Sequence, residues 1–258
     1  MLVKDIIRII EEKAPIGLAY DWDNSGFLCG DKNKEVKKIY LTLNTDIYTV
    51  NEAAELGADM IISHHPIMFG GINRIDISEP SGKIIETLIK NDIALYASHT
   101  TMDTADGGLN DVLAEKLGLI NTEIIEKADG FDGCGLGRIG YLEKPETLSE
   151  FAETVKDALE TPFVRVSGDM GILINKAAVG SGACADLIPA AADMGAQVMV
   201  TADMKYHTAI DAVESGICVI DAGHYPTERF AADIFGQLLK NSGCELFYST
   251  EKDIFSVL

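Results

Sequence analysis

A repeated pattern of residues constrains the fold of this chain most strongly. Residues 191–201 can be laid on residues 53–63 without a gap, and both stretches read as the end of a helix, a Gly-Ala turn, a buried strand and a hydroxyl residue. The next predicted strands also match, because residues 93–97 lead to His99 and Asp103, and residues 217–222 lead to His224 and Glu228 at the same spacing. Two matches in the same order indicate an internal duplication.

The duplication predicts an α/β fold made of two similar αβ lobes. Each lobe is expected to contain a mixed sheet flanked by helices, with functional residues after the strands and a metal site between the lobes. We expect an N-terminal lobe over residues 1–127 and a C-terminal lobe over residues 128–258. Residues 126–140 are rich in Gly and Asp and are interpreted as a junction. An alternative is that the C-terminal helix and strand pack back on the first lobe.

Composition excludes several classes of function. The formal net charge of −20 repels nucleic acid and anionic membrane surfaces, and the basic residues are dispersed. No apolar run reaches the roughly 18 to 20 residues that span a bilayer. The five cysteines form no C-x-x-C pair, so we expect a cytoplasmic protein with neither disulfides nor a thiolate zinc site. The excess acid fits divalent cation binding, but a solvated surface explains it as well.

Two adjacent histidines, His64 and His65, stand where the predicted strand over residues 60–62 ends. The carboxyl end of a strand in a parallel sheet is where sites are built, and imidazole is a common metal ligand. The alternative is two polar residues at a strand end. The matching strand end in the second half favours the metal interpretation.

Each half of the chain offers such residues after its strands. The first half offers His64, His65, His99 and Asp103, and the second offers Asp203, His207, His224 and Glu228. Zinc, iron, manganese and cobalt all accept mixed imidazole and carboxylate ligands. These donors are too many for one tetrahedral structural ion, so two ions roughly 3.5 to 4 Å apart account better for their number.

For the other candidate functional residues, the sequence allows two interpretations each. His99 could donate a hydrogen bond that orients Asp103, or could be a satisfied core histidine. Asp203, Lys205 and His207 could line a cavity and move protons, or could form a polar strand-to-helix turn. Residues 180–182 lack the full glycine pattern of a phosphate loop and are interpreted as a tight turn.

Several ordered motifs carry a family resemblance over almost the whole chain. They are Trp22-Asp23-Asn24-Ser25-Gly26, Gly57-Ala58-Asp59 leading to Ser63-His64-His65-Pro66, His99-Thr100-Thr101-Met102-Asp103, residues 135–140, residues 201–207, and Gly223-His224-Tyr225-Pro226-Thr227-Glu228. With them the chain resembles the GTP cyclohydrolase I type 2-like proteins, also called the NGG-interacting-factor-three-like family. Some members carry an inserted domain between the halves, and this chain resembles the short form.

The resemblance implies a dinuclear metal site formed by His64, His65, Asp103, His224 and Glu228, with two divalent ions per subunit. It also implies a ring-shaped homohexamer whose sites face an internal cavity. Two positions depart from the family pattern: Asn44 stands where the family usually has Asp, and Ala202 where it usually has Gly.

We therefore expect a metal-dependent hydrolase in which a metal-activated water attacks the guanine imidazole ring of GTP or a related substrate. Asp203 and His207 are the candidate catalytic residues. The expected partner is a small molecule such as a nucleotide, with neither nucleic acid nor membrane involved. The alternative is a non-catalytic metal-binding ring that stores or delivers ions or serves as a regulatory scaffold.

Overall fold

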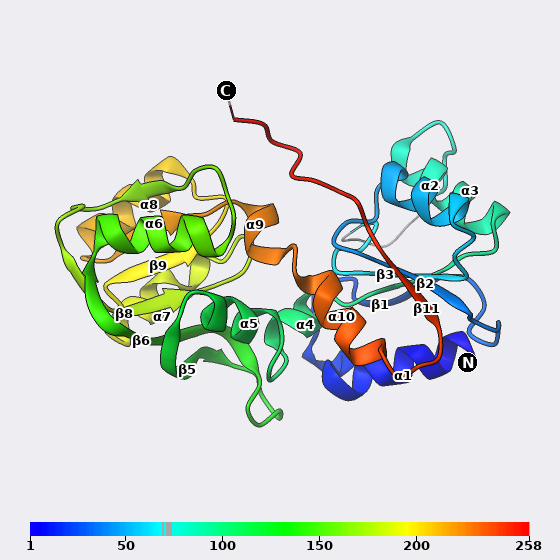
Figure 1. Cartoon of the computed structure of the whole chain (residues 1–258), viewed down its shortest axis with the longest axis horizontal. Helices are drawn as coiled ribbons and strands as arrows, with labels where there is room; N and C mark the ends of the chain where they lie inside the picture. The colour runs from blue at the N-terminus through cyan, green and yellow to red at the C-terminus, as the bar shows by residue number, and fades with distance from the viewer. Residues whose placement is uncertain (69, 71–73, 258) are drawn as a thin grey trace. The chain divides into compact units, whose positions relative to one another are not determined.

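The structure is a computed structural model that describes residues 1–68, 70 and 74–257. The chain forms two compact units, each built on its own sheet (Figure 1). The first unit comprises Met1–Ala105 and Phe230–Lys252, and the second comprises Asp106–Arg229 and Asp253–Leu258. No helix among the described residues is long and apolar enough to cross a membrane.

The first unit has a five-stranded sheet in the order β1-β4-β3-β2-β11. Its strands are β1 (Gly26–Cys29), β2 (Lys38–Thr42), β3 (Met60–Ser63), β4 (Ala94–Ala97) and β11 (Glu245–Tyr248). Four of them run parallel, and β1 is antiparallel to β4 at one edge. The strands β3 and β4 are buried throughout, which explains why they read as continuous apolar runs.

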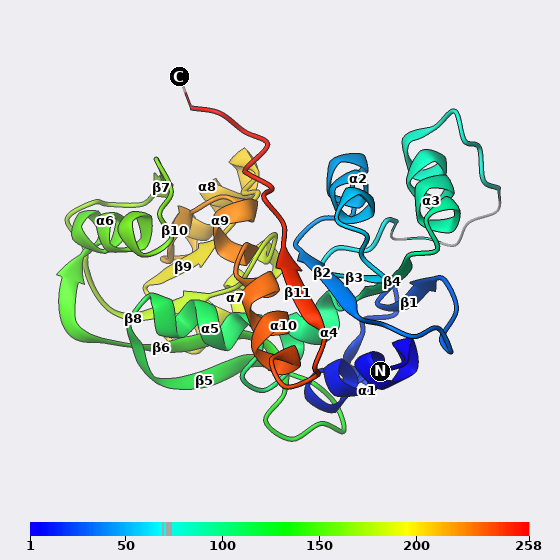
Figure 2. The same cartoon turned by 45° about the vertical axis from the view of Figure 1, so that its right-hand side comes forward.

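Helices cover both faces of this sheet (Figures 1 and 2). On one face, α2 (Ile47–Glu55) and α3 (Pro80–Lys90) pack against a core that includes Tyr40, Ile61 and Leu95. On the other, α10 (Ala231–Leu239) contacts β2, β3 and α1 (Val3–Lys13). Two short helices, Ile16–Leu18 and α4 (Thr100–Thr104), contact each other.

The second unit has a six-stranded sheet in the order β5-β6-β8-β9-β10-β7. Its strands are β5 (Leu119–Lys127), β6 (Gly135–Thr147), β7 (Arg165–Ser167), β8 (Leu173–Val179), β9 (Val198–Thr201) and β10 (Cys218–Asp221). Its helices are α5 (Leu109–Lys116), α6 (Leu148–Ala158), the 3-10 turn Ala185–Leu187, α7 (Ile188–Asp193), α8 (Tyr206–Glu214) and α9 (His224–Glu228). The α7 and α8 helices pack over a core that includes Met199 and Val219, and α5 and α6 contact β6 and β8.

The internal duplication is confirmed by the topology. The run β2-β3-β4 is parallel and ends in the antiparallel edge strand β1, and the run β8-β9-β10 is parallel and ends in the antiparallel edge strand β7. The matched turns close with the same bond, since Ala58 N donates to Ala53 O and Ala196 N donates to Ala191 O, both at 2.9 Å. The expectation of mixed sheets flanked by helices is therefore correct.

Two segments differ from the sequence-based expectation. Residues 126–140, expected to form a junction, contain the end of β5, the connecting turn and the start of β6, which pair as an antiparallel hairpin. The two short apolar runs at residues 172–174 and 177–179 read as separate strands in the sequence, but residues 173–179 form one strand, β8. In both places Gly, Asp or Lys interrupts the apolar pattern, but neighbouring strands supply the backbone hydrogen bonds.

Candidate metal centre

The backbone of the two histidines after β3 is hydrogen-bonded to the segment at the end of β2. His64 N donates to Thr42 O at 3.2 Å and His65 N donates to Leu43 O at 2.8 Å, so the pairing with the neighbouring chain continues past the strand. His64 is fully buried and His65 is half-buried. Both side chains therefore leave the carboxyl end of a parallel strand, the place where α/β proteins build their sites.

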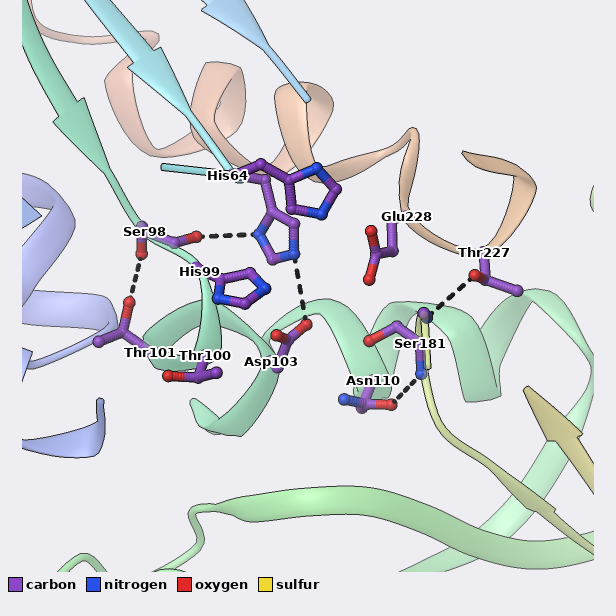
Figure 3. A network of polar contacts seen from close by, with 12 residues as sticks. His64, Ser98, His99, Thr100, Thr101, Asp103, Asn110, Ser181, Thr227 and Glu228 are labelled. Carbon is purple, nitrogen blue, oxygen red and sulfur yellow. Dashed lines mark hydrogen bonds and ion pairs between the residues drawn. The ribbon is translucent and has the colours of Figure 1, made fainter. Parts of the chain in front are cut away.

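Each of these imidazoles is held through Nδ1. Nδ1 of His64 lies 2.9 Å from the carbonyl oxygen of Ser98 (Figure 3), and Nδ1 of His65 lies 2.8 Å from Oδ1 of Asn44. Because these oxygens accept, Nδ1 carries the proton and Nε2 carries the lone pair of the neutral ring. Histidines that bind a metal through one ring nitrogen usually donate the other to an oxygen in this way.

Asn44 connects His65 with the carboxylate of Glu251. Nδ2 of Asn44 donates to Oε2 of Glu251 at 2.8 Å, so the amide oxygen must face His65. Glu251 also accepts from Leu43 N at 2.6 Å and from Thr42 Oγ1 at 2.7 Å. Asn44 thus orients His65, because its amide donates to Glu251 and accepts from the imidazole.

Asp103 lies beside His64. Its carboxylate is buried, and Oδ1 is 3.6 Å from Nε2 of His64 (Figure 3). This separation exceeds a hydrogen bond. Two atoms that each lie roughly 2.0–2.2 Å from one ion are no more than about 4.4 Å apart, so the two atoms suit ligands of a shared ion.

His99 completes a group of three imidazoles in the first unit. One ligand atom from each of His64, His65 and His99 lies within 4.8 Å of the others, so this group could hold a metal ion. The Nδ1 atom of His99 is 2.8 Å from Oδ1 of Asp23. The sequence suggested that His99 orients Asp103. In the structure, the partner of its Nδ1 is Asp23 instead.

Asp23 is surrounded by donors. Oδ2 accepts from Ser25 Oγ and Thr100 Oγ1, both at 2.6 Å, and Oδ1 accepts from Asn24 N at 2.7 Å. Burial raises the pKa of Asp23, but hydrogen bonds from His99, Ser25 and Thr100, together with the charge of His99, outweigh it and hold the pKa well below its ordinary value. Asp23 is therefore a carboxylate at neutral pH.

In the second unit, α9 carries His224 and Glu228 one helical turn apart. Nε2 of His224 lies 2.9 Å from Oε2 of Glu228, and Glu228 is buried. Burial lowers the pKa of His224, but the hydrogen bond to Glu228 and its charge, followed by those of Asp203, raise the pKa to about 9. Without metal, a proton thus holds these two side chains together.

Asp203 orients His224 from the turn after β9. Its Oδ2 lies 2.7 Å from Nδ1 of His224, and its φ of +54° is rare for a residue other than glycine. Asp221 stabilises this turn, since its carboxylate accepts from Met204 N at 3.0 Å and from Gly223 N at 3.1 Å. Asp221 thus fixes the backbone beside both Asp203 and His224.

The other residues proposed near this turn are exposed. His207 lies on α8, where its ring contacts Tyr206 edge-on, and Lys205 precedes that helix. Their proposed part in proton transfer or substrate binding stays a prediction.

The backbone of Gly182 lies against the side chains of His224 and Glu228. A Cβ at this position would lie 2.1 Å from Oε1 of Glu228 and 3.2 Å from Nε2 of His224, and the residue has a φ of +58°. The loop backbone therefore approaches the donor atoms as closely as glycine allows. With imidazole nitrogens and carboxylate oxygens as donors, the residues present fit zinc, iron, manganese or cobalt.

Comparison with known proteins identifies the family. A family model described as Duf34/NIF3 (NGG1p interacting factor 3) matches residues 1–253. The chain belongs to the Duf34/NIF3 family.

Proteins similar to this Duf34/NIF3 chain match most of its length. A Clostridium perfringens protein named "GTP cyclohydrolase 1 type 2 homolog" is 38% identical over 228 residues, which are 88% of this chain and 87% of that protein. The Bacillus cereus protein related to NIF3 has 28% identity and a TM-score of 0.90, covering 100% of this chain and 99% of that one. Reduced HcgD from Methanocaldococcus jannaschii has 33% identity and a TM-score of 0.82, covering 97% and 98%.

Asp203 apart, the sequence did not single out the residues that hold the histidines. Asp23 lies in a motif noticed only for its family resemblance, and Asn44 only as a departure from that pattern, whereas Glu251, Asp221 and Gly182 carried no signal as supporting groups. Acceptor oxygens are common, and their partners here lie far along the chain: 76 residues separate Asp23 from His99, and 207 separate Asn44 from Glu251.

Proposed function

We propose that this Duf34/NIF3 protein is a metal-dependent hydrolase that binds two divalent metal ions. Its ligands would be His64, His65 and Asp103 from the first unit, with His224 and Glu228 from the second. The observation that supports the proposal is the hydrogen bond from Nδ1 of each of these three histidines to an oxygen, because it leaves Nε2 as the atom that would bind an ion. Zinc, iron, manganese and cobalt all suit these donors.

The chain's own residues would hold charge and protons for the reaction. Divalent ions, when bound, lower the pKa of water toward neutrality and so supply the nucleophile of a hydrolase. The buried carboxylates of Asp103 and Glu228 offset positive charge. Asp203 keeps the Nδ1 proton on His224, and we propose that Asp203 and His207, both exposed, exchange protons with the substrate.

The proposed substrate is GTP or a related nucleotide, by analogy with the name of the Clostridium perfringens relative. One water would add to C8 of guanine and open the ring between C8 and N9, and a second would release C8 as formate. The phosphates would require cations. We nominate Lys205 and Arg74, two exposed side chains near the motifs, for that contact.

The test is formate release by the metal-loaded protein. Protein loaded separately with each of the four metals should release formate from GTP and change the ultraviolet spectrum of the nucleotide. Glu228→Gln should abolish both metal binding and release, whereas Glu214→Gln, at an exposed glutamate of α8, should change neither. Saturation at fewer than two ions per chain would contradict a dinuclear centre.

A second candidate is a metal-binding protein without catalysis, which stores or delivers ions or serves as a scaffold. The deep burial of His64, Asp103 and Glu228 favours it, because buried donors suit an ion that is retained. Full metal loading without turnover of any nucleotide would support this function over the hydrolase. We also propose that the chain assembles as a homohexamer, which its mass in solution by light scattering would test.

A further inference from the structure

His99 has the features of a metal ligand, although the five-ligand set omits it. Its ring centroid lies 5.1 Å from that of His64 and 5.5 Å from that of His65. A ligand atom of each of the three rings lies within 4.8 Å of the others. Because Asp23 accepts from Nδ1, Nε2 is the nitrogen of His99 that can bind an ion.

The hydrogen bonds through Nδ1 separate the histidines of the chain into two kinds. Among the residues that the structure describes, His64, His65, His99 and His224 each place Nδ1 within 2.9 Å of an oxygen. For His207 the described contact is the edge-on ring of Tyr206, and the side chain is exposed. His99 therefore groups with the three proposed ligands and not with the surface histidine.

The duplication leads to the same grouping. His99 caps α4 and precedes Asp103 by four residues, and His224 begins α9 and precedes Glu228 by four. The two motifs are offset by one residue relative to the strands, since Ser98 N donates to Ser63 O as Ala222 N donates to Thr201 O. In both halves, nevertheless, a histidine at the start of a one-turn helix donates Nδ1 to an aspartate.

We propose that His99 binds metal through Nε2 as a third imidazole of the first unit, and that Asp23 is the residue that positions it. The inference rests on the metal binding of the proposed function but not on hydrolysis. It also assigns a role to the Trp22–Gly26 motif, which the five ligands leave unexplained.

The surroundings of Asp23 fix the ring of His99 from several sides. Ser25 donates to Asp23 and accepts from His99 N at 3.0 Å, so the motif binds the backbone and the ring of His99 at once. Thr100 donates to Asp23 through its hydroxyl at 2.6 Å and through its backbone at 3.2 Å. Trp22 packs edge-on against the imidazole with 5.8 Å between ring centroids. This arrangement restrains both the tautomer and the direction of Nε2.

The first experiment measures zinc affinity by competition with a chromogenic chelator. His99→Gln should weaken the binding of one ion by at least tenfold. For the positioning residue, Asp23→Leu should weaken it by about 10–100-fold, the usual effect of removing the partner of a metal-bound histidine. Asp23→Asn keeps an oxygen that accepts from Nδ1 and should restore most of the loss. An affinity of His99→Gln equal to that of the unmodified protein would overturn the proposal.

A second measurement identifies the ligand by its spectrum. In the cobalt-loaded protein, the ring N–H of each coordinated histidine gives a paramagnetically shifted proton resonance. His99→Gln should remove one such resonance, and His207→Gln should remove none. An unchanged set in His99→Gln would contradict the assignment.

A third measurement needs no variant and so is independent of folding. Imidazole ¹⁵N spectra of the unmodified protein, recorded without metal and with zinc, should show a large change at Nε2 of His99 on loading. The same shift in both states would overturn the proposal.

One control separates this inference from the proposed function. His64→Gln should lose metal binding if the first unit holds an ion at all. Retention of full binding by His64→Gln would contradict the metal centre itself. Loss in His64→Gln together with full binding in His99→Gln would overturn only the role of His99.

Discussion

Glu251 accepts a hydrogen bond at 2.8 Å from the side-chain amide of Asn44, and the oxygen of that amide faces Nδ1 of His65 at the same distance. An amide fits between these neighbours because one requires a donor and the other an acceptor. The carboxylate of Glu251 also binds Leu43 N and Thr42 Oγ1. The orientation of His65 thus depends on a residue near the C-terminal end of the described chain.

The first prediction concerns this contact. Asn44→Asp would place a second carboxylate against Glu251, so we expect a loss of about 1–3 kcal/mol in the free energy of unfolding and weaker zinc binding at His65. Adding Glu251→Gln should restore most of both, because a neutral amide can again donate to the carboxylate at position 44. Urea unfolding and zinc competition measure the two effects.

A matched control for that pair is Glu245→Gln, at an exposed glutamate of β11. It removes the same charge without touching Asn44, so it should not rescue Asn44→Asp. Equal rescue by the two glutamine substitutions would show that net charge, and not the local contact, is responsible.

The second prediction concerns the close approach of Gly182 to the donor atoms. Gly182→Ala should weaken metal binding by about 10–100-fold, because the new Cβ would overlap Glu228. Gly57→Ala is the matched control: its φ is +66°, but no atom of the described residues lies within 4 Å of a Cβ there. Both variants should lose about 1–2 kcal/mol of stability from backbone strain, and only Gly182→Ala should lose metal. Equal metal affinities would contradict this prediction.

The third prediction concerns pH. In the metal-free protein the pKa of His224 is raised from 6.5 to about 9. Because the folded state binds this proton more tightly than the unfolded state, the pair with Glu228 contributes its full stability below pH 6.5. That contribution is lost as pH rises from 6.5 to about 9. The unfolding midpoint in urea, measured across this range, should therefore fall more for the unmodified protein than for Glu228→Gln. Parallel curves would argue against the raised pKa.

The fourth prediction follows from the same proton. A metal ion at His224 must displace it, so loading between pH 6.5 and about 9 should release a proton from that ring. Titration with zinc in unbuffered solution measures the release. The His224→Gln variant should release about one proton fewer per chain.

The fifth prediction distinguishes a structural motif from the metal site. Arg138, in the motif over residues 135–140, is buried and makes two hydrogen bonds of 2.6 Å to the carboxylate of Asp111. Arg138→Leu should destabilise the fold by about 3–5 kcal/mol, since it breaks a largely buried ion pair. At temperatures where this variant is folded, its zinc affinity should equal that of the unmodified protein. A selective loss of zinc would assign the motif to the site.

The sequence could predict the repeated units because their pattern is local. The match between residues 53–63 and 191–201 spans one helix end, one turn and one strand, and the same hydrogen bonds form in both. The β5–β6 hairpin could not be read in this way, because its pairing depends on strands that face each other across a Gly-rich turn. Propensity along the chain is weak evidence where tertiary pairing decides the structure.

The same distinction between local and tertiary information applies to the candidate site. Chemistry alone indicated His64, His65, His99 and Asp103, since few side chains bind metals. What each ring nitrogen contacts is set by residues from other elements, such as Asp23 for His99. Only the folded chain shows which nitrogen is held and which one can bind an ion.

The segment Phe230–Lys252 belongs to the first unit, where α10 packs against α1 and β11 extends the sheet beside β2. On the ribosome, the two segments of the first unit are therefore made before and after the long segment Asp106–Arg229 of the second unit. The strands β1 to β4 are thus made without β11, so the edge of β2 has no partner strand during that interval. His65 gains its Asn44–Glu251 support only after Glu251 has been made, 207 residues after Asn44, so the proposed metal binding through His65 would have to follow the synthesis of that segment.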